Sequence, residues 1–146
     1  MYVPHFDAIL HALGTSRAQL EGKSEITIPT SLFRFLLKIA VSHGEFNESG
    51  YLAANIDVRS AVKRGQIADP REHYTTFGYF EGRRGATPAV DEVWYRSTNP
   101  DIAAAIARGE LKSGSDHFAT IGAEEFRAPS ALHHPATQEW KKALKR

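Results

Sequence analysis

The chain has 146 residues, a net charge of +1 and no cysteine. This length suits one domain, or one domain with a docked appendage, and the lack of cysteine excludes disulfides, thiolate metal sites and a cysteine nucleophile. A near-zero charge argues against a nucleic-acid partner, which a broad basic field would attract. The first residues lack a signal peptide's basic start and apolar run, and no apolar stretch is long enough to cross a bilayer. We therefore expect a cytoplasmic protein without a transmembrane segment.

Residues 1–45 predict an N-terminal helical segment. Apolar residues recur at helical spacing over residues 6–13. Ser16 and Gln19 have the spacing of a capping box, which predicts a second, short helix. Residues 30–43 predict a longer helix that is apolar nearly all round. Such a helix must be covered by its neighbours, so we expect it at the centre of the core.

The rest of the chain is dominated by a degenerate tandem repeat. Residues 46–83 align with residues 90–127 at a constant offset of 44, without a gap and with 12 identities in 38 positions. Self-similarity of this period is typical of stacked supersecondary units. We therefore predict two repeat units, copy 1 (residues 46–89) and copy 2 (residues 90–127). The predicted fold is all-α, one compact domain with the N-terminal helices packed on two tandem three-helix units.

Each copy predicts three short helices separated by capping residues. Asn47 or Asp91 caps the first helix, and Asn55 or Asn99 caps the second. Glycines then follow the second and third helices in both copies. Asp69 opens the third helix of copy 1, and Ser113 or Ser115 opens that of copy 2. The residues expected to have structural roles are Asn55, Asn99, Gly65, Gly109, Gly78, Gly122, His73 and His117.

The last residues, 128–146, form a basic tail. Four cations and one carboxylate give it a local charge of +3. Thr137 is the expected cap of a final helix that carries Trp140 and Leu144 on one face. We expect residues 130–146 to pack weakly or to dock on a partner, with Trp140 as the anchor.

The repeat resembles a widespread bacterial unit of the approximate form F-D-x3-Y-L-x2-N-P-D-V, followed by A-V, G, H-Y, G and E-G-R. The resemblance covers residues 46–127 and departs from the pattern at Ile56, in place of Pro, and at Phe126, in place of Gly. Such units occur singly or in tandem, sometimes beside glycosyltransferase or cell-surface modules. The resemblance implies a proteobacterial helical protein whose repeat unit has no catalytic activity.

Several recurrent side chains are candidates for either packing or binding. His73 and His117 hold equivalent places, and since duplicated units rarely both build a catalytic site, we interpret them as hydrogen-bonding framework residues. Arginines recur two residues after a glutamate in both copies and fit either an ion pair between elements or capture of a ligand carboxylate or phosphate. Trp94 stands where copy 1 has Gly50, which suggests a specialised surface or a gap filled by packing. The candidate partner-binding residues are Tyr51, Arg83, Trp94, Tyr95, Arg127 and Trp140.

No nucleophile elbow, phosphate loop, dinucleotide fingerprint or zinc-protease motif occurs in the sequence. We predict no catalytic residue, no cofactor and no metal site. The leading functional hypothesis is a non-catalytic interaction module, an adaptor or scaffold that binds another protein in a larger bacterial assembly. The main alternative is a carbohydrate-binding module linked to surface polysaccharides and based on the aromatic residues Tyr51, Trp94 and Tyr95. A small enzyme is a third, weaker hypothesis.

Overall fold

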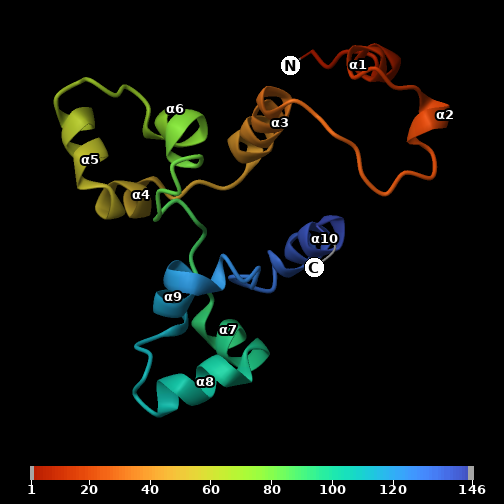
Figure 1. The fold of residues 1–146 in the computed structure, drawn as a ribbon. Coiled ribbons are helices and arrows are strands. Elements are labelled where there is room, and N and C mark those ends of the chain that lie inside the picture. The colour runs from red at the N-terminus through yellow and green to blue at the C-terminus, as the bar shows by residue number, and fades with distance from the viewer. Residues whose placement is uncertain (1, 145–146) are drawn as a thin grey trace. The chain divides into compact units, whose positions relative to one another are not determined.

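The computed structural model describes residues 2–144, and within them all regular structure is helical, as predicted (Figure 1). The chain divides into an N-terminal unit, residues 1–40, and a C-terminal unit, residues 41–146. The predicted packing of the N-terminal helices on the repeats stays a prediction. Among the described helices, none is long and apolar enough to cross a membrane.

The N-terminal unit contains α1 (Phe6–Ala12), α2 (Arg17–Leu20) and most of α3 (Thr30–His43). Ser16 accepts a hydrogen bond from the Gln19 amide, so the predicted cap of α2 is confirmed. The Arg17 guanidinium donates to the Asp7 carboxylate at 2.6 Å and thereby joins α2 to α1. Leu10 is the buried residue of α1.

The prediction that residues 30–43 form the centre of the core is wrong. The helix α3 forms with the predicted bounds, but none of its residues is buried. Phe33, Phe35 and Leu36 each remain about half exposed. An apolar pattern that runs nearly all round a helix specifies no single inward face, and the closely packed residues of the chain lie instead inside the two copies.

The helices of the C-terminal unit follow the 44-residue offset. Copy 1 contains α4 (Glu48–Ala54), α5 (Ile56–Lys63) and α6 (Pro70–His73), and copy 2 contains α7 (Glu92–Thr98), α8 (Pro100–Ala107) and α9 (Gly114–His117) (Figure 1). Each third helix continues into a π-helical turn, η1 (Tyr74–Gly78) or η2 (Phe118–Gly122), that the sequence did not predict. Superposition of the copies as equivalent three-helix bundles stays a prediction.

The capping residues behave largely as the sequence predicts. Asn47 and Asp91 accept hydrogen bonds from the first turns of α4 and α7, and Asp69 and Ser113 do so for α6 and α9. After the second helices, Gly65 and Gly109 have φ values of 71° and 76°, a left-handed conformation that favours glycine. The capping role of Asn55 and Asn99 is wrong: they stand at the cap positions, but neither makes a side-chain cap hydrogen bond.

Each copy is closed by the chain segment that follows its helices. The Asn47 amide donates to the Ala86 carbonyl oxygen at 3.1 Å, and the Asp91 amide donates to the Pro129 carbonyl oxygen at 3.0 Å. Ala86 and Ala128 are buried. The residues just after Arg127 therefore complete copy 2, although the sequence placed them in the basic tail.

Two separate apolar clusters lie in the C-terminal unit. Tyr51, Val58 and Ala86 form the cluster of copy 1. Tyr95, Ile102 and Phe118 form that of copy 2. In both clusters a tyrosine from the first helix packs against a β-branched residue from the second. The gapless sequence alignment thus corresponds to equivalent contacts.

The tail forms α10 (His134–Ala143), which begins three residues before the predicted cap. Thr137 lies inside this helix and donates to the His133 carbonyl oxygen, so its predicted capping role is wrong. Pro135 sits at the start of the helix, where its missing amide costs no hydrogen bond. The His133 ring approaches the Ser130 hydroxyl at 2.7 Å and the Glu45 carboxylate at 3.2 Å, which connects the start of α10 to the segment before α4.

The closing contacts predict two different outcomes for shortening the tail. A chain that ends at Ala131 keeps Ala128 and the hydrogen bond to Pro129, so we expect copy 2 to stay folded. A chain that ends at Arg127 loses both, and its melting temperature should fall by several degrees more, because about 1 kcal/mol is expected for the hydrogen bond alone. Thermal unfolding monitored by Trp94 fluorescence compares the two. An equal fall in melting temperature in the two shortened chains would contradict the closing role of residues 128–130.

Candidate functional site

A tyrosine–histidine hydrogen bond lies at the centre of each copy. In copy 1 the Tyr51 hydroxyl is 3.0 Å from His73 Nδ1, and in copy 2 the Tyr95 hydroxyl is 2.9 Å from His117 Nδ1. Both tyrosines have no exposed surface. Because a buried hydroxyl without a partner is costly, the histidine satisfies a group that packing has removed from water. The matching hydrogen bonds predicted from the in-phase recurrence of these histidines are present.

The tyrosine hydroxyl explains why a glycine ends each π-helical turn. A Cβ atom added to Gly78 would collide with the Tyr51 hydroxyl, and one added to Gly122 would collide with that of Tyr95. Neither glycine has a left-handed backbone, so close approach and not φ requires it. These residues are therefore structural, but for a reason that differs from the predicted helix stop.

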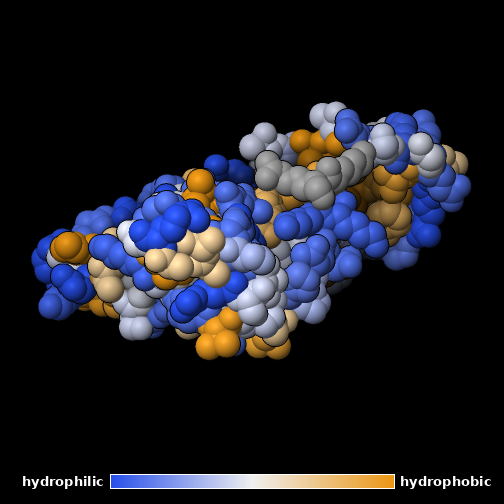
Figure 2. Space-filling model, turned by 90° about the horizontal axis from the view of Figure 1, so that it is seen from below, coloured by the Kyte–Doolittle hydropathy of each residue, from blue (hydrophilic) through white to orange (hydrophobic). Residues whose placement is uncertain are grey.

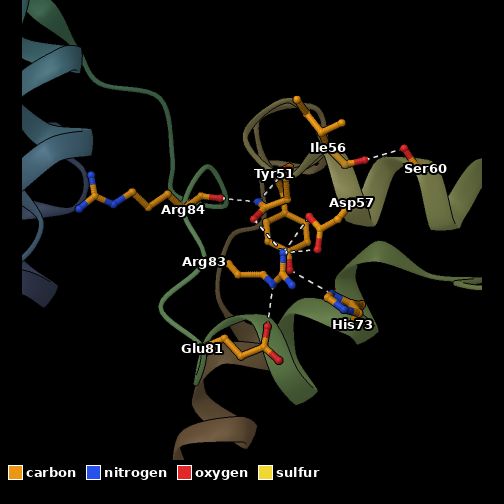
Figure 3. Close-up of polar contacts among 9 residues, drawn as sticks. Tyr51, Ile56, Asp57, Ser60, His73, Glu81, Arg83 and Arg84 are labelled. Atoms are coloured by element: carbon orange, nitrogen blue, oxygen red, sulfur yellow. Dashed lines mark hydrogen bonds and ion pairs between the residues drawn. The ribbon is translucent and has the colours of Figure 1, made fainter.

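A second polar cluster surrounds the recurrent arginine of each copy, and Figure 3 shows that of Arg83 in copy 1. Arg83 donates to Glu81 at 2.6 Å and to Asp57 at 3.0 Å. The equivalent Arg127 donates to Glu125 at 2.7 Å and to Asp101 at 2.8 Å. Each arginine thus holds the start of the second helix against the turn that follows the third.

The two asparagines complete these clusters as donors. Asn55 Nδ2 donates to the carbonyl oxygens of Tyr51 and Arg84, and Asn99 Nδ2 donates to that of Tyr95. The Asn55 amide thus fixes the closing segment of copy 1 to α4, because it donates to carbonyl oxygens of both. The Oδ1 atoms, through which these residues would cap the following helices, instead accept from Arg83 at 3.4 Å and from Arg127 at 2.8 Å.

The electrostatics of the clusters follow from these bonds. Hydrogen bonds from Arg127 lower the pKa of Asp101, and those from Arg83 lower the pKa of Asp57. Burial raises the pKa of Tyr51, and it raises the pKa of Tyr95 to about 12. Both tyrosines therefore remain neutral donors or acceptors across the physiological pH range.

The predicted partner-binding residues differ in their burial and in their contacts. Tyr51 and Tyr95 are fully buried and cannot contact a partner, so that assignment is wrong for them. Arg83 and Arg127 are engaged by carboxylates of their own copy. Trp140 on α10 remains 50% exposed. Of the six candidates, Trp140 is thus the one whose side chain most clearly faces solvent.

The contrast between Trp94 and Gly50 has a packing cause. In copy 1 a Cβ added to Gly50 would collide with the Gly85 carbonyl oxygen, because the closing segment passes directly over this position. In copy 2 the Trp94 ring is partly buried and lies edge-on to the His134 ring, with 5.7 Å between centroids. The tryptophan therefore packs against the start of α10.

The sequence missed residues that differ between the copies and lie at the surface between them. Tyr79, Arg84 and Glu124 line one cleft there. The available signal was the lack of identity at these positions, because the framework residues recur and these do not. Within residues 2–144, no group of three or more His, Asp or Glu side chains is arranged to hold a metal ion. No family model, curated protein or solved structure matches the chain.

The tyrosine–histidine bond predicts a measurable loss on mutation. His73→Ala leaves the Tyr51 hydroxyl buried without its partner, and we expect the free energy of unfolding to fall by about 1–3 kcal/mol. Adding Tyr51→Phe removes the unsatisfied hydroxyl, so the double variant should be less destabilised than the two single effects summed. Urea denaturation of the four proteins measures this coupling. Strictly additive changes in the free energy of unfolding would show that this hydrogen bond contributes nothing to stability.

The shifted pKa of Tyr95 predicts alkaline instability. Tyrosine ionises at about pH 10 in an unfolded chain, whereas the pKa of Tyr95 in the folded protein is about 12. Its stabilising contribution is complete below about pH 10 and is lost as the pH rises through about 12. Unfolding free energies measured across this window should fall less steeply for Tyr95→Phe than for wild type. If the unfolding free energy falls with pH at the same slope in both proteins, the raised pKa of Tyr95 is contradicted.

Proposed function

We propose that the chain is a non-catalytic interaction module that binds another protein. The observation that carries this proposal is that the chain's recurrent polar side chains and its exposed apolar side chains have different roles. The recurrent histidines, arginines and asparagines are engaged within their own copies, whereas several large apolar side chains reach solvent. Phe77, Ile121 and Trp140 are each about half exposed, and Figure 2 shows apolar side chains at several places on one face of the molecule.

This distribution suits protein binding. Aromatic side chains with both apolar surface and solvent access concentrate binding energy in protein interfaces. The resemblance of residues 46–127 to bacterial repeat units agrees with a scaffold role, since such units imply no activity of their own. A repeat whose polar groups are used to hold its fold can change its outward residues without losing stability.

The carbohydrate alternative has lost the residues on which it was based. It required exposed aromatic faces at Tyr51, Trp94 and Tyr95. Two of these side chains are fully buried, and the ring of the third lies against His134. We therefore favour a protein partner.

Affinity capture tests the proposal with Trp140 as the probe. The tagged chain is incubated with lysate from its source organism, and retained proteins are identified by mass spectrometry. We expect a specific protein whose retention falls at least tenfold with Trp140→Ala. Gln138→Ala, an exposed change on the same helix, is the control and should retain the partner.

Two results would count against a protein partner. The first is capture that survives protease treatment of the lysate and is lost after glycosidase treatment, which would indicate polysaccharide. The second is the failure of any protein to be retained by a folded wild-type chain under conditions of low and physiological salt.

A further inference from the structure

The two copies border a cleft of about 450 Å³ within the C-terminal unit. Copy 1 contributes Tyr74, Tyr79 and the segment that contains Arg84. Copy 2 contributes the turn η2 with Phe118 and Ile121, and the following Glu124. We call this space the inter-copy cleft. Its volume lies in the range of sites that hold small ligands or a few residues of a peptide.

Several residues that line the cleft are not duplicated, although two others, Arg83 and Thr120, recur as Arg127 and Thr76. At the 44-residue offset, Tyr79 corresponds to Ala123, Arg84 to Ala128, and Glu124 to Phe80. The framework residues of the same copies are identical: Tyr51 and Tyr95, His73 and His117, Arg83 and Arg127. The residues that hold each copy together thus recur, whereas Tyr79, Arg84 and Glu124 in the cleft have changed in charge or size. Such a pattern is expected if the cleft serves a purpose that only one junction in the chain needs.

Arg84 differs from the framework arginines in its partners. Arg83 and Arg127 each donate to two carboxylates of their own copy at distances of 3.0 Å or less. Arg84 lies 3.7 Å from Glu124, and the two side chains are 57% and 75% exposed. An exposed ion pair of this kind contributes little stability, so an incoming carboxylate can displace it at small cost.

The backbone of Arg84 is nevertheless fixed. Its carbonyl oxygen accepts a hydrogen bond from Asn55 at 2.9 Å, and the next residue but one, Ala86, is buried in the core of copy 1. The Arg84 side chain therefore extends from a fixed backbone position (Figure 3), and the residue lines the cleft. This combination of an anchored backbone and an exposed planar cation suits the recognition of a carboxylate.

The remainder of the lining is largely apolar. Phe118 is buried at 5% exposure, while Tyr79 and Ile121 are 38% and 45% exposed. The Tyr79 ring lies edge-on to that of Tyr74, with 6.1 Å between centroids. The Thr120 hydroxyl donates to the Asp116 carbonyl oxygen and is thus already engaged. Tyr79 and Ile121 offer an apolar surface that matches an aromatic or branched aliphatic side chain.

We propose that the inter-copy cleft binds a peptide segment of a partner protein, which inserts one bulky apolar side chain and places an adjacent carboxylate on Arg84. The apolar side chain contacts Tyr79 and Ile121, and the carboxylate replaces Glu124 as the partner of the guanidinium. This inference rests on the proposed interaction function and names the chemistry of the segment recognised.

Titration with defined peptides tests this assignment. The probe is a blocked tetrapeptide, acetyl-Gly-Asp-Phe-Gly-amide, added up to millimolar concentration to the 15N-labelled full chain. We expect saturable amide shifts at Tyr79, Arg84, Ile121 and Glu124. Peptides with Asn or Lys in place of Asp, or Ser in place of Phe, should bind about tenfold more weakly, since each lacks one of the two contacts.

Variants of the protein provide the matched comparison. Arg84→Gln should weaken binding of the Asp-Phe peptide about tenfold and leave its affinity equal to that of the Asn-Phe peptide. Arg108→Gln is the control, because Arg108 is exposed and paired with Glu110 away from the cleft; it should bind like wild type. Both variants change exposed side chains, and their spectra report directly whether the fold is kept.

Three outcomes would overturn the proposal: no saturable shift with any peptide, equal affinities of wild type and Arg84→Gln, or cleft shifts produced by cellobiose and not by peptide. The test is separable from that of the general function. If Arg84→Gln retains a protein partner in affinity capture while no peptide binds the cleft, the cleft assignment fails and the interaction function stands. If peptides bind the cleft but no protein is retained in affinity capture, the cleft assignment stands and the proposed interaction function fails.

Discussion

A buried tyrosine hydroxyl is the constraint on which each copy depends. Tyr51 and Tyr95 lie wholly inside their clusters, so their hydroxyls must find a partner there. The histidine at the end of the third helix supplies it, and the glycine five residues later leaves room for the hydroxyl. First helix, third helix and π-helical turn are thus fixed by one polar atom, and a change at any of the three disturbs the others.

The arginine clusters extend this constraint to the rest of each copy. Arg83 and Arg127 connect the second helix to the turn after the third, and Asn55 fixes the closing segment to the first helix. Small apolar clusters of three buried residues carry limited hydrophobic stabilisation. Satisfied polar contacts of this kind specify one arrangement among the several that such a small core would allow.

The sequence predicts well what recurs and poorly what does not. The constant offset and the capping pattern locate the helices, the caps Asn47 and Asp91, and the left-handed Gly65 and Gly109, because each depends on a few neighbouring residues. The hydrogen bonds of the Asn55 side-chain amide depend on a segment distant in sequence, which no periodicity predicts. The π-helical turns depend on an extra residue per turn, which the helical pattern does not predict either. For α3, the apolar pattern predicted the helix but not its exposure.

The candidate site was predictable only in part, for a related reason. Attention to repeated residues selected Tyr51, Tyr95, Arg83 and Arg127, which proved to hold the fold. Contact surfaces are expected where copies diverge, yet divergence alone also follows from local packing, as Gly50 and Trp94 demonstrate. Only the structure distinguishes a difference that faces a cleft from one that faces a neighbouring segment.

The closing segment has a consequence for how such a chain can grow. Asn47 binds Ala86, and Asp91 binds Pro129, one residue earlier than the 44-residue offset would place it. Each copy therefore includes its own closing segment, and only residues 87–90 separate Ala86, which closes copy 1, from Asp91, the first cap of copy 2. Because this connection is so short, the distance between the apolar clusters of successive copies is set by the copies themselves. An array built by further duplication would keep a constant pitch without any change in its linkers.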